Sequence, residues 1–250
     1  MAGALVTGAG KRLGRAMALA LGKAGYDVAV HYNSSSADAE AVAAEIRAMG
    51  RKAAAVQADL SSEAETAALT TKSNAALGPL SLLVNSASVF EHDDIATMTR
   101  ESWDRHIETN LRAPLKLAQD FAAQAENGAN NLIVNIIDQR VLKLTPQFLT
   151  YTLSKSALAT LTVTLAQALG PKGIRVNAIA PGPTLRNARQ SEADWARQNA
   201  ATILGHGADP DDISGALLYL SSARSVTGQM IAVDGGQHLA WRTADVLVQE

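Results

Sequence analysis

The feature that most constrains the fold is a repeated alternation of short apolar runs with amphipathic stretches of helical length. Such alternation, with apolar and β-branched strands, indicates a parallel sheet covered by helices on both faces, an α/β fold. The predicted strands are residues 4–7, 27–31, 53–58, 80–84, 132–137, 174–179 and 230–233. The stretches between them are long enough for crossover helices, so we expect a doubly wound seven-stranded sheet.

Several helix boundaries have sequence signals. Ser36, with Glu40 close behind it, is expected to cap the second helix. A long helix over 150–169 should stop at Gly170, and Asp209 should begin another, with Pro210 in its first turn. Because we find no linker, repeat or low-complexity stretch, residues 1–250 are predicted to form one domain.

Composition narrows the function classes. The 250 residues are 47% hydrophobic and 18% charged, which suits a substantial core and argues against general disorder. A net charge of -2 without basic blocks predicts neither nucleic acid nor an anionic membrane surface as a partner. There is no cysteine, and the five histidines lack ligand spacing, so we expect no metal. Without a long apolar run or a signal peptide, a cytoplasmic location is expected.

A glycine-rich turn joins the first predicted strand to the first predicted helix, with the spacing GxGxxxG over residues 8–14. Glycine permits a tight turn and lets backbone N–H groups approach a pyrophosphate at the helix N-terminus. The turn predicts a dinucleotide site, and the alternative is a plain strand–helix turn. Its expected cofactor-binding residues are Gly8, Gly10, Lys11, Arg12, Leu13 and Gly14.

The end of the second predicted strand distinguishes the two nicotinamide cofactors. An acid there would bind the ribose 2′-OH of NAD, but no acid occurs until Asp38. Positive charge on Lys11 and Arg12 favours the 2′-phosphate of NADP, so NADPH is expected to be preferred, with NADH possible. The alternative is that both cations are solvated surface charges. The residues expected near the adenosine are His31, Tyr32, Asn33 and Ser34.

Tyr151 and Lys155 stand four residues apart at the start of the long helix, which places both side chains on one helical face. A nearby cation favours the phenolate and would lower the tyrosine pKa from about 10 toward neutrality. Such a tyrosine can protonate a carbonyl or an imine as hydride arrives. Such a pair is commonplace and usually structural, but its position after the fifth predicted strand and downstream of the glycine turn favours the general acid of a reductase acting on a small molecule.

Over nearly its full length, the chain resembles the short-chain dehydrogenase/reductase family. The matching landmarks are Thr7-Gly8-x5-Gly14, Asp59-Leu60, Asn85-Ser86-Ala87-Ser88, Asn110, Tyr151-x3-Lys155, Pro181-Gly182 and Val233-Asp234-Gly235-Gly236. The resemblance implies a Rossmann-type sheet and a homotetramer. It makes Tyr151 the general acid, and has Lys155 lower its pKa and hold the nicotinamide ribose.

The resemblance assigns further roles near the cofactor. Asn110 would anchor a water of the proton relay. Asp59 and Leu60 would flank the adenine, and Asn85 would lie by the cofactor ribose. The remaining implied cofactor contacts are Ser86, Ala87, Pro181, Gly182 and Thr184.

Three departures from the family pattern resemble its pteridine reductase branch. Arg12 replaces a glycine, Ser88 ends the Asn-Ser-Ala-Ser motif, and Asp138 stands where a serine is usual. In that branch the arginine reaches the cofactor phosphates and the pterin pocket, and an aromatic residue, here Phe90, stacks on the pterin. The implied substrate contacts are Arg12, Ser88, Phe90, Asp138 and Tyr151. Ser34 departs from the branch, whose trypanosomatid members carry an arginine for the 2′-phosphate.

Several of these residues have alternative interpretations. Asp138 would pair with Arg140 or cap the loop, and Phe90 would be ordinary packing. Asn110 would satisfy backbone groups at a helix bend. His106, on an amphipathic helix, is expected at the surface.

Two segments lie outside the regular alternation of strands and helices. Residues 183–205 interrupt the strand–helix rhythm and are expected to form a substrate lid. The tail over 237–250 would cross a subunit interface or be disordered.

The first hypothesis for the function is an NADPH-dependent reductase of a pterin or a dihydrofolate-like compound. The alternatives are a carbonyl or 3-oxoacyl reductase and a non-catalytic NADP-binding sensor or scaffold.

Overall fold

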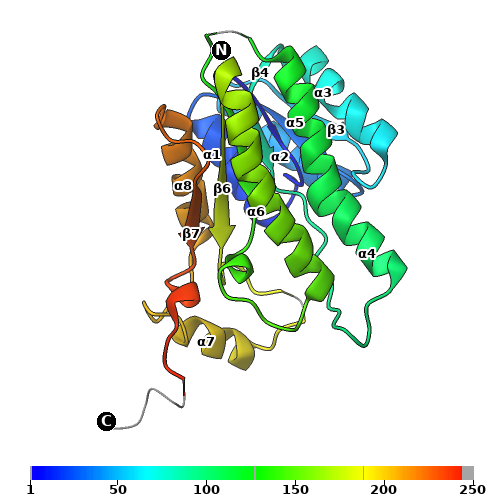
Figure 1. Ribbon diagram of the computed structural model, residues 1–250. Coiled ribbons are helices and arrows are strands. Elements are labelled where there is room, and N and C mark those ends of the chain that lie inside the picture. Colours follow the sequence, from blue (N-terminus) through cyan, green and yellow to red (C-terminus); the bar gives the residue numbers. More distant parts are fainter. Residues whose placement is uncertain (1, 127, 188, 244–250) are drawn as a thin grey trace.

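The computed structural model describes residues 2–126, 128–187 and 189–243, and its strands form one parallel sheet (Figure 1). The strands are β1 (Gly3–Val6), β2 (Asp27–Tyr32), β3 (Ala53–Gln57), β4 (Leu80–Asn85), β5 (Asn131–Ile136), β6 (Ile174–Pro181) and β7 (Met230–Val233). Their order is β3-β2-β1-β4-β5-β6-β7. The order reverses between β1 and β4, where doubly wound sheets form ligand clefts. The prediction of a seven-stranded, doubly wound parallel sheet is confirmed.

Helices cover both faces of the sheet because its strands are apolar on both sides. In β1, Ala4 and Val6 pack into one core cluster and Leu5 packs into the other, as the twofold alternation of a strand requires. The first cluster includes side chains of α1 (Arg12–Lys23), α2 (Ser36–Ala48) and α8 (Pro210–Ser222). The second includes side chains of α3 (Glu63–Leu77), α5 (Ala113–Gln124) and α6 (Leu149–Leu169). The apolar sequence pattern thus fixes both layers.

Shorter elements lie mainly at the carboxyl ends of the strands. They are α4 (Arg100–Ile107), the π-helix η1 (Glu108–Arg112), the 3-10 helices η2 (Gln139–Val141), η3 (Gly170–Lys172) and η4 (Gln237–Leu239), and α7 (Glu192–Ala200). The predicted lid segment contains α7, which the sequence analysis did not predict. In Figure 1, α7 lies beyond the ends of the strands, next to the C-terminal segment. Residues 244–250 of the predicted tail lie outside the described residues.

Most predicted boundaries lie within one or two residues of the observed ones, but the prediction that Ser36 caps α2 is wrong. Ser36 is already helical, Ser35 precedes it, and no serine side chain caps the helix. Glu40 bonds the guanidinium of Arg47 instead, because an ion pair is available on the same exposed helix. The start of α8 is confirmed, since the Asp209 N–H donates to the Asp212 carboxylate at 2.8 Å.

Strand β6 continues two residues beyond its predicted end, to Pro181. Proline has no N–H to donate to a ladder, and the next residue, Gly182, donates its N–H to the Val233 carbonyl at 3.0 Å. The extension pairs Pro181 with Val233 of β7 and brings both chain segments to the cleft edge. Within the described residues, no helix has the length and apolar character to cross a membrane.

Candidate active site

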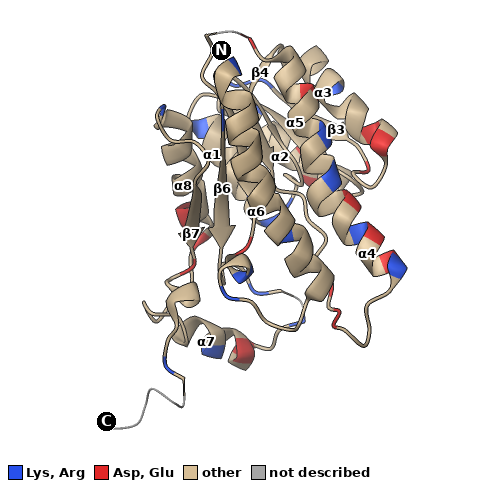
Figure 2. Ribbon diagram, in the orientation of Figure 1, with Lys and Arg blue, Asp and Glu red and all other residues tan. Residues whose placement is uncertain are grey.

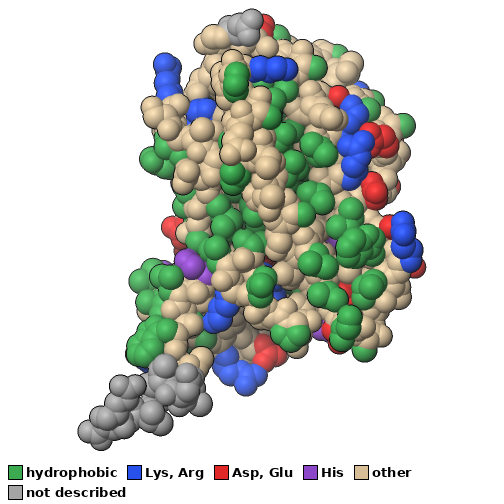
Figure 3. Space-filling view, viewed as in Figure 1, with side chains coloured by type: hydrophobic (Ala, Val, Ile, Leu, Met, Phe, Trp, Pro, Cys, Tyr) green, Lys and Arg blue, Asp and Glu red, His purple; other side chains and the backbone are tan. Residues whose placement is uncertain are grey.

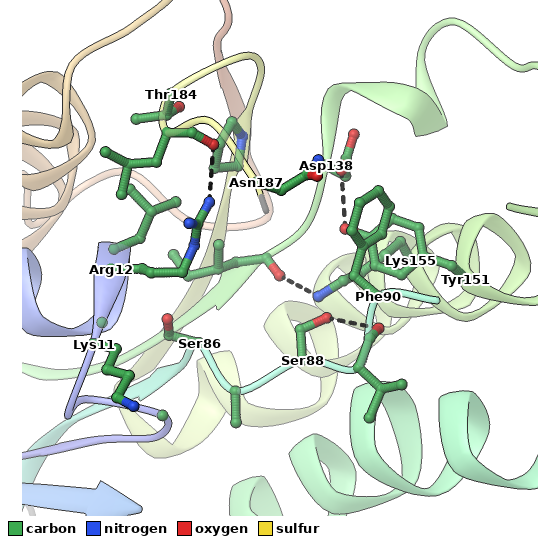
Figure 4. A pocket seen from close by; sticks show the side chains of 18 of the residues that line it. Lys11, Arg12, Ser86, Ser88, Phe90, Asp138, Tyr151, Lys155, Thr184 and Asn187 are labelled. Carbon is green, nitrogen blue, oxygen red and sulfur yellow. Dashed lines mark hydrogen bonds between the residues drawn. The ribbon is translucent and has the colours of Figure 1, made fainter. Parts of the chain in front are cut away.

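A cleft of about 920 Å³ runs along the carboxyl ends of the strands. It begins at the glycine turn after β1 and reaches Tyr151 and Lys155 at the start of α6 (Figure 4). This volume suits a ligand of cofactor size. Most of the predicted cofactor residues line it: Gly8, Gly10, Lys11, Arg12, Leu13, Gly14, His31, Tyr32, Asn33, Ser34, Asp59, Leu60, Ser86, Ala87, Pro181, Gly182 and Thr184. Strands β1, β2, β4 and β6 therefore bring together residues far apart in the sequence.

The glycine turn is held tightly against its neighbours. Gly8 has φ of +64°, and a Cβ there would lie 2.9 Å from the Cα of Ala87. At Gly14 a Cβ would lie 2.2 Å from the Gly8 carbonyl oxygen. Glycine is thus required at both positions, once for its backbone angle and contact and once for contact alone.

His31 braces this turn from β2. The Gly8 N–H donates to its Nδ1 at 3.0 Å, so Nε2 carries the ring proton and donates to the Ala58 carbonyl, also at 3.0 Å. Burial lowers the pKa of His31 to about 4, which keeps the ring neutral. The histidine therefore supports the turn as a neutral hydrogen-bond bridge.

Arg12 occupies a strained backbone position. Its φ is +52°, a left-handed conformation in which glycine would be unstrained, and glycine is usual there in the family. Its guanidinium donates to the carbonyl oxygens of Leu185 at 2.9 Å and Arg186 at 3.1 Å. Arg12 thus ties the glycine turn to the segment after β6, a contact that the sequence analysis did not predict. Its predicted role toward cofactor phosphates stays a prediction.

Lys11 extends from the same turn and forms an ion pair with Asp38 at 3.0 Å. Both side chains are about half exposed. The end of β2 presents Asn33, Ser34 and Ser35 to the cleft, with no carboxylate among them. This end of the cleft is therefore polar and carries a lysine that can exchange partners.

Two predicted residues stand behind the cleft wall rather than in it. Asn85 donates to the Asn135 side chain at 2.9 Å, within the sheet. Asn110, in the π-helix η1, accepts from the Val89 N–H at 2.8 Å and donates to the Val89 carbonyl at 2.9 Å. Neither is among the described residues that line the cleft. Asn110 holds backbone at a helix irregularity, as its alternative interpretation predicted, and its role toward a water stays a prediction.

At the other end of the cleft, the Tyr151 hydroxyl donates to Oδ2 of Asp138 at 2.9 Å. Oδ1 of Asp138 accepts from the Arg140 N–H at 2.8 Å, so the carboxylate both caps the loop and contacts the phenol. Burial raises the pKa of Asp138. Burial and the neighbouring Asp138 charge raise the pKa of Tyr151 well above 10. The geometry describes a protonated phenol paired with a carboxylate.

This result corrects the expectation that Lys155 lowers the pKa of Tyr151. The Lys155 Nζ donates to the Ile136 carbonyl at 2.9 Å and lies 5.7 Å from the centre of the tyrosine ring. Burial lowers the pKa of Lys155 from 10.5 to about 8. Burial and Asp138, which contacts the phenol directly, raise the pKa of Tyr151, and the more distant ammonium does not reverse this direction.

Phe90 packs in a group of aromatic rings beside Tyr151. Its ring stacks on Phe148 with centroids 4.5 Å apart and 6° between the planes. The Tyr151 ring lies edge to face with Phe90, with ring centroids 4.7 Å apart. All three rings line the cleft. The sequence analysis missed Phe148, for which only its position three residues before Tyr151 was a signal.

A buried polar cluster fixes the start of α6. Asp93 accepts from the N–H and the hydroxyl of Thr150 and from the Ser102 hydroxyl. It thereby caps the helix that carries Tyr151, from 57 residues away in the sequence. His106 also bonds Thr150 and is fully buried, so its expected surface position is wrong. The residue before α6, Phe148, has no side chain that can cap a helix, and this was the signal that the cap comes from a distant residue.

Comparisons with known proteins agree with this geometry. A family model described as enoyl-(acyl carrier protein) reductase matches residues 8–238. The chain is 38% identical to an uncharacterized oxidoreductase of Methylorubrum extorquens over 93% of this chain and 96% of that one. It is 32% identical to the 3-oxoacyl-[acyl-carrier-protein] reductase FabG of Staphylococcus aureus over 94% and 98%.

Solved structures add a more similar relative. The FolM alternative dihydrofolate reductase 1 from Brucella suis, in complex with NADP, superposes with a TM-score of 0.94 at 46% identity. The match covers 98% of each chain. Together with the cleft and the Tyr151–Lys155 pair, these matches show that the chain belongs to the short-chain dehydrogenase/reductase family of oxidoreductases.

Proposed function

We propose that the protein is an NADPH-dependent reductase of a C=N bond in a pterin or dihydrofolate-like substrate. The observation that carries this proposal is the hydrogen bond from Tyr151 to Asp138 at 2.9 Å, inside a cleft that Phe90 also lines. A family serine offers a neutral hydroxyl at that position, whereas a carboxylate accepts N–H groups and stores a proton. The likeness to the Brucella suis alternative dihydrofolate reductase supports the same reading.

The cleft fits a nicotinamide dinucleotide. The turn before α1 has no room for side chains at Gly8 and Gly14, and the first turn of α1 offers its N–H groups to a pyrophosphate. Lys11 and Ser34 suit a 2′-phosphate, and Pro181 and Gly182 also line the cleft. When bound there, NADPH supplies the hydride. The Brucella suis structure is itself an NADP complex.

Tyr151 would supply the proton to the substrate nitrogen as the adjacent carbon accepts hydride, so that C=N becomes CH–NH. The tyrosinate left behind would face the ionised Asp138, and this repulsion disfavours its survival. Asp138 has a raised pKa, so it can take up a proton from water as the tyrosinate forms and pass that proton to the tyrosine oxygen. We therefore assign Asp138 as the proton reservoir of Tyr151.

Lys155 would balance this exchange electrostatically. Its ammonium lies over the Tyr151 ring and donates to the Ile136 carbonyl from a fully buried position. A positive charge there stabilises negative charge on either partner of the Tyr151–Asp138 pair. Lys155 would also hold the nicotinamide ribose.

A second candidate is the reduction of a simple ketone or a 3-oxoacyl thioester. The observation that favours it is 32% identity to a 3-oxoacyl reductase over nearly the whole chain. In that case Asp138 would replace serine without a change of reaction. A non-catalytic NADP-binding scaffold would not need the Tyr151–Asp138 contact.

The test is NADPH oxidation at 340 nm with 7,8-dihydrobiopterin, 7,8-dihydrofolate and a panel of ketones and 3-oxoacyl thioesters, repeated with NADH. We expect turnover of the dihydropterins with NADPH, and its loss in Tyr151→Phe. Turnover of ketones alone would contradict the proposal and support the second candidate. A Tyr151→Phe variant as active as the wild type would contradict a role for this tyrosine as acid.

We also propose a homotetramer in the cytoplasm. Apolar side chains of Leu153, Val163 and Trp103 are exposed on α6 and α4. Figure 2 shows few charged residues along α6, and Figure 3 shows hydrophobic side chains spread over the same face. Light scattering should give four times the chain mass, and a monomer would contradict this assembly.

A further inference from the structure

Two arginines flank the aromatic rings at the substrate end of the cleft. The Arg140 guanidinium carbon lies 4.7 Å from the centre of the Phe148 ring, and that of Arg189 lies 5.5 Å from the centre of the Phe90 ring. Both arginines line the cleft. Because Phe90 and Phe148 stack on each other, the four side chains form one continuous group of two rings and two cations.

Both guanidinium groups have donors to spare. In the part of the chain that the structure describes, the Arg140 guanidinium donates one bond, to the Thr145 hydroxyl at 3.1 Å, and the Arg189 guanidinium donates one, to the Phe90 carbonyl at 3.0 Å. A guanidinium carries five N–H donors. Among the described residues, no carboxylate forms an ion pair with either. Within the described residues, the two cations at this cleft wall thus lack a direct ion pair, although Arg140 attracts the Asp138 carboxylate from a longer distance.

The charges at this end of the cleft do not balance. Lys11 and Arg12 lie at the glycine turn, where cofactor phosphates would meet them. Arg140, Arg189 and Lys155 remain near Tyr151, and Asp138 is the one carboxylate that lines this end within the described residues. The substrate end therefore keeps a positive excess, which attracts an anionic ligand.

The backbone at Phe148 indicates that this arrangement is functional. Phe148 has φ of +57°, and among the described non-glycine residues only Phe148 and Arg12 have positive φ. Such strain persists where the surroundings impose it, often at ligand sites. Here the strained residue places its ring against Phe90 and beneath Arg140.

We infer that the substrate combines a flat ring system with a carboxylate, and that Arg140 and Arg189 are the residues that select the carboxylate. Flat rings pack against Phe90 and Phe148, and carboxylates accept paired N–H bonds from guanidinium. This inference rests on the proposed function, because it describes the substrate of the same site. It singles out compounds such as dihydrofolate over dihydropterins with an uncharged side chain.

The test compares two substrates that share the ring, 7,8-dihydrofolate and 7,8-dihydrobiopterin, in the wild type and in Arg140→Gln and Arg189→Gln. Each variant should raise the KM for dihydrofolate about tenfold, as loss of a charged hydrogen bond predicts, with kcat within about twofold. The KM for dihydrobiopterin should change less than about twofold. Arg197→Gln, on exposed α7, is the matched control and should change neither value.

Equal KM changes for both substrates, or none, would overturn the inference while leaving the proposed function intact. If neither pterin is reduced, the proposed function fails, and a binding measurement still decides the inference. That measurement is titration of the NADP-loaded enzyme with 4-aminobenzoylglutamate and with its uncharged dimethyl ester. We expect the dicarboxylate to bind about tenfold more tightly, and that preference to vanish in Arg189→Gln. Equal binding of the two compounds by the wild type would overturn the inference.

Discussion

Replacing Asp138 by asparagine removes a carboxylate while nearly keeping the shape of the side chain. In the wild type its Oδ2 accepts the Tyr151 hydroxyl at 2.9 Å. Two unit negative charges at that separation repel by about 6 kcal/mol at an effective dielectric constant of about 20. Burial and this repulsion together keep the phenol protonated, and Asp138→Asn removes the repulsion.

Two changes should follow from this substitution. Without the anionic neighbour the pKa of Tyr151 falls, so the alkaline limb of the pH–rate profile moves to lower pH. Without the proton reservoir, kcat should fall about 10²- to 10³-fold, the range for loss of a proton-transfer group. The acid limb that reflects protonation of Asp138 should disappear.

The assay is the initial rate of NADPH oxidation with saturating 7,8-dihydrobiopterin between pH 5 and 10, for the wild type, Asp138→Asn and Asp138→Ser. The serine variant restores the residue usual in the family and serves as the matched control for polarity without charge. A kcat for Asp138→Asn within about threefold of the wild type, with an unmoved alkaline limb, would refute the reasoning. Because Asp138 also accepts the Arg140 N–H, thermal unfolding should confirm that both variants fold.

Three further predictions concern residues around the cleft. Lys155→Met should abolish turnover but raise the free energy of unfolding at pH 7 by about 3 kcal/mol, because burial lowers the pKa of the lysine from 10.5 to about 8. Urea titration at pH 7 and 10.5 checks this, and an equal gain in the free energy of unfolding at both pH values would contradict it. The pKa of His31 is about 4 in the folded protein and 6.5 in the unfolded chain, so the free energy of unfolding should fall by about 3 kcal/mol as the pH falls from 6.5 to 4. Urea titrations should show that this loss is absent from His31→Asn. A variant that loses as much stability in acid would contradict the role of neutral His31 as a hydrogen-bond bridge. Lys11→Gln should raise the KM for NADPH about tenfold and leave that for NADH unchanged; steady-state kinetics with both cofactors decide, and equal effects would refute a 2′-phosphate contact.

Much of the fold was predictable because its signals are local. Apolar runs, crossover-length stretches and the glycine turn depend on nearby residues, and they predicted the sheet. The prediction that Ser36 caps α2 was wrong because the spacing of a serine and a glutamate does not reveal whether the glutamate has a better-placed partner. Glu40 forms an ion pair with Arg47 instead.

The site was predictable where a motif fixes the spacing of its residues along the sequence. It was not predictable where the tertiary fold brings distant residues together. Tyr151 and Lys155 share one helix, so their proximity follows from the sequence. The pKa of Tyr151 depends on Asp138, which β5 brings to the phenol, and sequence spacing alone assigned the larger effect to Lys155. The contacts of Arg189 and Phe148 with Phe90 join three separate segments, which no local pattern encodes.

The most direct test of the central claim is hydride transfer from NADPH deuterated at C4 of the nicotinamide. With each C4 epimer of the labelled cofactor and 7,8-dihydrobiopterin or 7,8-dihydrofolate, mass spectrometry and proton NMR of the product locate the label. The account predicts that one epimer delivers a single deuterium to the carbon of the former C=N bond, and that Tyr151→Phe greatly slows its appearance. A tetrahydropterin without deuterium from either epimer, or no product while a ketone takes up the label, would contradict it.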